Sequence, residues 1–166
     1  DSYFYFLTDT HWVPGAEGVK NWTAMPDLFP YPDAFGYIQN QTGLQLMLHN
    51  RHFAPDNVYA KNPAAPIGDT LYNGETFDFV WGYFLKPDLL LPGAGIPNPA
   101  NGEAERFYTY FLGEKVKKGL KVYYQDWYSV NLGFIPQLTA NVSFGDEWMR
   151  QMGAGASQAG TNINIC

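Results

Sequence analysis

Charged residues are scarce in this sequence, and positive charge is scarcer still. Lys, Arg, Asp and Glu make up 16% of the 166 residues, whereas 46% are hydrophobic and 17% aromatic. So few charges leave much of the surface apolar, and we expect something else to cover part of it. The basic residues number ten against sixteen acidic ones. One basic group, Lys115, Lys117 and Lys118, is expected on the solvated face of a helix, so binding of nucleic acid phosphates is not expected.

Long apolar runs and paired cysteines are missing as well. No stretch approaches the roughly 20 residues that cross a bilayer, and the start at Asp1 lacks the charged and apolar regions of a signal peptide. The single cysteine, Cys166, is either a free thiol or the partner of a cysteine outside this sequence. We interpret residues 1–166 as a single domain of a soluble chain that is already processed or is an excerpt of a larger protein.

Three N-glycosylation sequons begin at Asn21, Asn40 and Asn141, and none has proline in its middle position. Three sequons in a chain of this length favour the secretory pathway. We therefore expect a secreted, extracellular glycoprotein that carries glycans at these positions.

Apolar runs of strand length follow predicted helices in a regular rhythm. The helices are predicted at 32–40, 103–118 and 146–159, with Gly43, Gly119 and Gly160 after them as C-caps. The strands are predicted at 3–7, 44–48, 77–83, 120–124 and 161–165. The segments 13–32, 57–74 and 86–102 are rich in Gly, Pro or Asn and are predicted as loops.

This rhythm of helix, glycine and apolar strand is typical of a parallel sheet in an α/β protein. The sequence ends on a predicted strand, which suggests part of a larger fold. We expect about half of a (β/α)₈ barrel, and the alternative is an open doubly wound sheet.

Polar residues follow three of the predicted strands. They are Asp9 and His11 after the first strand, His49, Asn50 and Arg51 after the second, and Gln125, Asp126 and Trp127 after the strand at 120–124. Ligands of α/β folds bind beyond the carboxyl ends of the strands. Each residue alone could be a cap or a turn residue, but three sets at one edge favour a site.

Among these residues Asp126 carries the clearest signal. It follows the buried strand and is flanked by Trp127 and Tyr128, so its carboxylate is expected beside aromatic faces, an arrangement that recognises sugars. The alternatives are a carboxylate that caps the next turn and a structural ion pair with Arg51.

Four stretches resemble a known group of proteins. They are 18–23 (GVKNWT), 48–51 (LHNR), 122–127 (VYYQDW) and 148–153 (WMRQMG). They resemble secreted eukaryotic proteins with a glycoside-hydrolase-like (β/α)₈ barrel and, more distantly, retaining glycosidases of the α-galactosidase type. The resemblance implies that Asp126 is the nucleophile and that the acid/base carboxylate lies on a later strand, beyond Cys166.

A retaining glycosidase needs two carboxyl groups about 5 Å apart. Within this chain the candidates for the second group are Asp9 and Asp78, of which Asp9 is better placed. Sugar hydroxyls would be bound by His49, Asn50 and Arg51, and the stacking surfaces would be Trp127 and Trp12. No cofactor is needed for this chemistry.

Two other functions stay open. Asp9-Thr10-His11 resembles the Asp-x-His opening of binuclear metallophosphatases, but the other motifs of those enzymes are not present in proper form. The second alternative is a non-catalytic extracellular protein on the same barrel, whose aromatic, weakly charged surface contacts other chains of an assembly.

Overall fold

A computed structural model describes most of the chain. The described residues are 3–6, 8–13, 16–24, 34–64, 74–86, 89–126, 133 and 135–165. The structure is a mixed α/β fold in which one parallel sheet is accompanied by two antiparallel hairpins.

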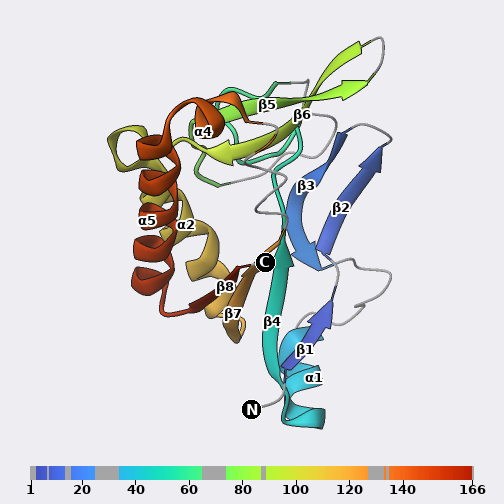
Figure 1. The fold of residues 1–166 in the computed structure, drawn as a ribbon. Helices are drawn as coiled ribbons and strands as arrows, with labels where there is room; N and C mark the ends of the chain where they lie inside the picture. The colour runs from blue at the N-terminus through green and yellow to red at the C-terminus, as the bar shows by residue number, and fades with distance from the viewer. Residues whose placement is uncertain are drawn as a thin grey trace.

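The parallel sheet has four strands (Figure 1). Across the sheet they are β1 (Tyr3–Phe6), β4 (Gln45–Asn50), β7 (Leu120–Gln125) and β8 (Asn162–Ile165). A helix precedes each of the last three strands, namely α1 (Ala34–Thr42), α2 (Glu103–Val116) and α5 (Val142–Ala159). The predicted parallel βα repeat is thus confirmed.

The predicted glycines follow these three helices. The φ angle is +67° at Gly43, +97° at Gly119 and +81° at Gly160, a left-handed conformation that strains any residue with a Cβ atom. The start of α5 differs from the prediction. The helix begins four residues earlier than 146, because the Asn141 side chain accepts a hydrogen bond from the Phe144 amide and caps the first turn.

The strands of the sheet follow one another in chain order. A doubly wound sheet reverses its order at a switch point, and the described strands contain no such reversal. Since crossovers between parallel strands are right-handed, an unbroken order places the connecting helices on one face. The helices α2 and α5 pack against each other on that side (Figure 1). On the opposite face Met47, Val122 and Tyr124 remain partly exposed.

Two segments predicted as loops form strands. After β1 the chain forms a hairpin of β2 (Thr8–Val13) and β3 (Ala16–Ala24), and after β4 it forms a second hairpin of β5 (Phe79–Lys86) and β6 (Leu89–Pro97). The loop predictions for 13–32 and 86–102 were therefore wrong over 16–24 and 89–97. Pro92 is tolerated because it lies at a shift in the β5–β6 register, opposite Tyr83. Both hairpins lie toward the end of the sheet where β4 finishes (Figure 1).

Phe53 joins the two hairpins to the end of β4. Its amide and carbonyl both pair with Gly95 of β6, each at 2.9 Å, and it bridges to Val19 of β3. Gly95 is required here, because a Cβ atom would overlap the ring of Trp81. The ring of Phe53 then enters an aromatic core in which Trp22 stacks on Phe111 of α2, with 4.4 Å between ring centroids.

Candidate functional site

Two predicted site residues meet at the carboxyl end of the parallel sheet. His49 lies near the end of β4, and Asp126 directly follows β7. The Asp126 amide donates to the Asn50 carbonyl at 2.8 Å, which continues the ladder between the two strands. The imidazole Nε2 of His49 is 2.9 Å from Oδ2 of Asp126. Side chains from two neighbouring strands thus form a hydrogen-bonded pair.

The two members of this pair differ in exposure. The His49 side chain is only 7% exposed, whereas that of Asp126 is 26% exposed. The ring of His49 also packs against Tyr124, at 5.7 Å between centroids. The arrangement is a carboxylate at the surface supported from behind by a buried imidazole.

Burial sets the charge of His49. Desolvation lowers the pKa of His49, the hydrogen bond and charge of Asp126 oppose this shift, and the positive charge of Arg51 adds to it. A neutral imidazole that faces an ionised carboxylate carries its proton on Nε2 and donates it to Oδ2. Such a hydrogen bond orients the carboxylate without neutralising its charge.

The other predicted residues of the second strand end lie elsewhere. Asn50 is fully buried, and its carboxamide donates to the Tyr123 hydroxyl at 2.8 Å. Since alternate residues of a strand face opposite sides, Asn50 points toward the helix layer and His49 away from it. Arg51 and the next residue, His52, are buried too. Burial and the charge of Arg51 lower the pKa of His52 to about 3, so its ring stays neutral.

The remaining candidates are only partly placed. The backbone of Asp9, His11 and Trp12 lies in β2, so these residues form a strand rather than the predicted loop, and their side chains are outside the description. Trp127 lies outside the described residues. Asp78 lies on the surface beside the first turn of α2, which we call the outer wall. Its side chain is 54% exposed, and its Oδ2 atom is 3.9 Å from Nζ of Lys61.

That outer wall carries a network of ion pairs. Glu103, at the start of α2, contacts Lys61 at 3.0 Å and forms a two-pronged pair with Arg106. These contacts, above all the hydrogen bonds from Arg106, lower the pKa of Glu103 to about 2. The network ties the segment before β5 to the first turn of α2.

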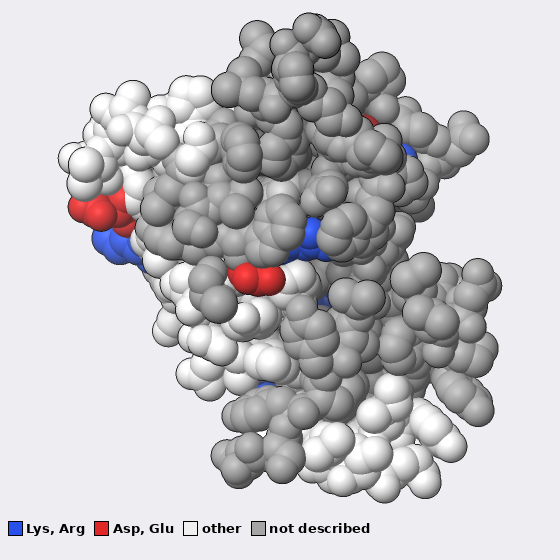
Figure 2. Space-filling view, turned by 45° about the vertical axis from the view of Figure 1, so that its right-hand side comes forward, with Lys and Arg blue, Asp and Glu red and all other residues white. Residues whose placement is uncertain are grey.

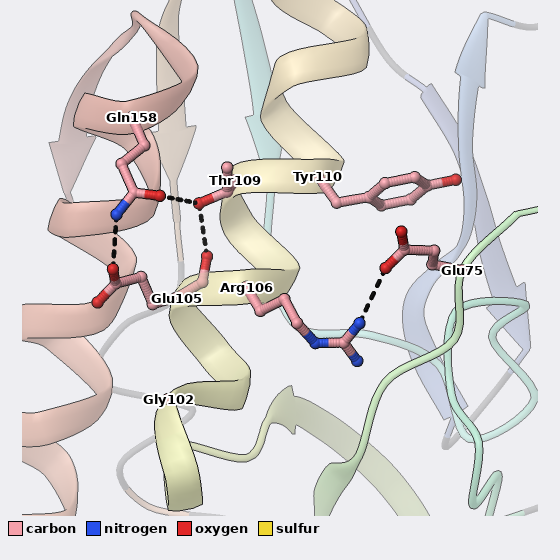
Figure 3. A pocket seen from close by; sticks show the side chains of 7 residues that line it. All are labelled: Glu75, Gly102, Glu105, Arg106, Thr109, Tyr110 and Gln158. Atoms are coloured by element: carbon pink, nitrogen blue, oxygen red, sulfur yellow. Dashed lines mark hydrogen bonds and ion pairs between the residues drawn. The ribbon is translucent and has the colours of Figure 1, made fainter.

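A groove of about 550 Å³ lies on the same wall (Figure 3). Its lining residues are Glu75, Gly102, Glu105, Arg106, Thr109, Tyr110 and Gln158. Their polar groups contact one another: Gln158 donates to Glu105 at 2.6 Å, and Arg106 pairs with Glu75 at 2.8 Å. Because these groups already satisfy each other, the groove is a weaker candidate than the strand-end pair.

Among the described residues, the charged side chains form no large patch on the face shown in Figure 2. The described acidic groups there are small, and some of them lie next to basic groups. Within the described residues, no three or more His, Cys, Asp and Glu side chains gather as a metal would require. Among the described helices, none has the length and apolar character to span a membrane.

Comparison with known proteins does not assign the chain to a family. No protein-family model matches the chain, and no curated protein matches its sequence. The site is therefore interpreted from its own geometry.

Two residues that matter for this geometry were not assigned a role from the sequence. Gln125 is 1% exposed and Tyr123 is fully buried, and their side chains are hydrogen-bonded to each other at 2.7 Å. The available signal was a glutamine two residues after a buried tyrosine, which places both on the same inward face of a strand.

Proposed function

We propose that this chain belongs to a secreted, carbohydrate-active protein of the glycoside hydrolase type, with Asp126 as its nucleophile or principal sugar ligand. The observation that supports this most is the Asp126 carboxylate, held by buried His49 at the carboxyl end of a parallel sheet. A carboxylate that is partly exposed and held by a hydrogen bond in this way suits attack on an anomeric carbon or binding of sugar hydroxyls.

We further propose that the sheet is half of a (β/α)₈ barrel. The chain-order arrangement of its four parallel strands supports this, as do the hairpins inserted where strands lead toward helices. Parallel sheets are normally covered on both faces, and in a barrel the partly exposed face with Met47, Val122 and Tyr124 would line the interior. Asp126 would then lie at the mouth of the barrel, where such folds bind substrates.

The proposed chemistry requires a second carboxyl group. In a retaining mechanism a carboxylate oxygen of Asp126 forms a bond to the anomeric carbon while the bond to the leaving oxygen breaks, and that oxygen takes a proton from a carboxylic acid about 5 Å away. Water then cleaves the ester with the second group acting as base. Asp9 is the candidate in this chain, since β2 begins two residues after β1 ends.

Replacement of Asp126 tests the proposal. In the full-length protein, Asp126→Asn is expected to lower turnover of activated aryl glycosides by roughly 10³-fold or more, with an unchanged circular dichroism spectrum. Asp78→Asn is the matched control, because Asp78 is an exposed carboxylate at the outer wall; its turnover should stay within about twofold of wild type. Unchanged turnover in Asp126→Asn would remove this residue from the mechanism.

A second variant separates the two roles of Asp126. If Asp126 is the nucleophile, a small external anion such as azide should restore part of the turnover of Asp126→Ala by attacking the anomeric carbon in its place. A residue that only binds sugar hydroxyls would show no such rescue.

The alternative is a non-catalytic extracellular glycoprotein on the same fold. It is favoured by the composition, in which 17% of the residues are aromatic and only 16% are charged, as expected of a surface that contacts other chains. Absence of turnover across α- and β-glycosides, for a protein that folds cooperatively, would support this alternative.

A further inference from the structure

A single buried side chain joins the two strand ends that carry the candidate site. The carboxamide nitrogen of Gln125 donates to the Arg51 carbonyl at 2.6 Å and to the Asp126 carbonyl at 3.0 Å. Its oxygen accepts from the Tyr123 hydroxyl at 2.7 Å. With both amide hydrogens and the oxygen engaged, the side chain of Gln125 is held in one orientation.

These contacts lie just past the end of the strand pairing. The last backbone rung between β4 and β7 runs from the Asp126 amide to the Asn50 carbonyl. The Arg51 carbonyl comes one residue later, where the chain leaves the sheet toward Phe53. Gln125 therefore extends the connection between the two strands by one side-chain rung. The separation of His49 and Asp126 depends on how the backbone is held at this junction.

The core fixes Gln125 in turn. The Tyr123 hydroxyl accepts from Asn50 at 2.8 Å, and the Tyr123 ring meets Trp22 edge to face at 5.7 Å. Burial raises the pKa of Tyr123 well above its usual value, so the hydroxyl keeps its proton and can donate it to Gln125. A chain of contacts thus runs from the aromatic core to the backbone of the site.

We propose that Gln125 is a positioning residue, whose carboxamide sets the position of Asp126 relative to His49. The role in a reaction rests on the function proposed above, but the positioning itself does not. Glutamate would present acceptor oxygens to two carbonyl oxygens, and methionine would offer no donor, so neither can replace the amide.

A double-mutant cycle tests this proposal without any measurement of turnover. His49→Ala, Asp126→Ala and the double variant are made in the wild-type chain and again with Gln125→Met, and each protein is unfolded with urea. In the wild-type background we expect the interaction between His49 and Asp126 to change the unfolding equilibrium constant by roughly tenfold. With Gln125→Met the coupling should fall below about twofold, because the two side chains are no longer held in register.

Gln151→Met is the matched control. Gln151 is another glutamine with 1% exposure, and its nitrogen donates to the Pro99 carbonyl at 2.6 Å, away from the strand ends. This variant should lose stability and leave the coupling between His49 and Asp126 intact. A purely structural role for Gln125 predicts the same behaviour for both glutamine variants.

Tyr123→Phe provides a milder perturbation should Gln125→Met fail to fold. It keeps the buried ring and removes the hydroxyl that Gln125 accepts from. A reduced coupling in this variant supports the proposal. Full coupling in either Gln125→Met or Tyr123→Phe would overturn it, as would the absence of coupling in the wild-type chain. Since turnover plays no part, a failed glycosidase assay would leave this result unaffected.

Discussion

At the residue scale, Lys115 departs from its expected place on a solvated helix face. The structure partly buries it, with its Nζ atom 5.7 Å from the centroid of the Trp22 ring. Burial, together with repulsion from Lys118, lowers the pKa of Lys115 to about 8. In the unfolded chain the pKa of lysine is about 10.4. Between these two values the unfolded state binds more protons, so Lys115 makes folding more favourable as pH rises through this window.

Substitution of Lys115 should reveal the free-energy cost of burying its charge. Lys115→Met keeps most of the apolar stem and removes the charge, so we expect it to be more stable than wild type by about 1–3 kcal/mol at pH 7. The difference should shrink between pH 8 and pH 10, as the wild-type lysine loses its proton. Urea unfolding at several pH values measures it, with Lys121→Met as control, because Lys121 is exposed and does not perturb Lys115. A difference that stays constant across this range would contradict the assignment.

At the scale of elements, the C-terminal ends of the helices could be predicted and the hairpins could not. A helix followed by glycine is a local signal, because the left-handed residue lies directly after the last turn. Strand pairing is decided by distant residues. Pro92 and Gly95 are typical of a loop, but the register shift opposite Tyr83 accommodates the first, and the approach of Phe53 and Trp81 requires the second.

The contact between α2 and α5 gives a sharp prediction at this scale. A Cβ atom on Gly155 would lie 2.6 Å from Cβ of Tyr108 and 2.8 Å from the Glu105 carbonyl oxygen, so α2 and α5 would have to separate. We expect Gly155→Ala to destabilise the fold by about 1–3 kcal/mol in urea unfolding. Gly153→Ala, two residues away with open space around its Cβ position, should be neutral or stabilising by up to about 1 kcal/mol. Equal effects of the two substitutions would contradict this packing.

At the scale of the whole molecule, the position of the candidate site could be predicted better than the contacts between its side chains. The end of the strand at 120–124 placed Asp126 at the edge of the sheet, and the structure confirms that position. Alternation along a strand also predicts that His49 and Asn50 face opposite sides. Which side faces the helices depends on the packing of α2 and α5, so the His49–Asp126 pair and the role of Gln125 became visible only in three dimensions.

The molecular surface also discriminates between the three sequons. Asn40 and Asn141 are exposed, whereas Asn21 is partly buried and precedes fully buried Trp22. N-glycans attach to the side-chain nitrogen, so a glycan on Asn141 leaves its oxygen free to cap α5.

We therefore expect glycans at Asn40 and Asn141 and none at Asn21 when the protein passes through the secretory pathway of a eukaryotic cell. Mass spectrometry of glycopeptides measures occupancy at each site. Asn141→Asp should remove one glycan and keep the helix cap, so its stability separates the contribution of the glycan from that of the cap. Asn141→Ala removes both and should cost about 1 kcal/mol more. A folded protein that carries a glycan at Asn21 would contradict the discrimination by burial, and a secreted protein without any glycan would contradict the assignment of all three sequons.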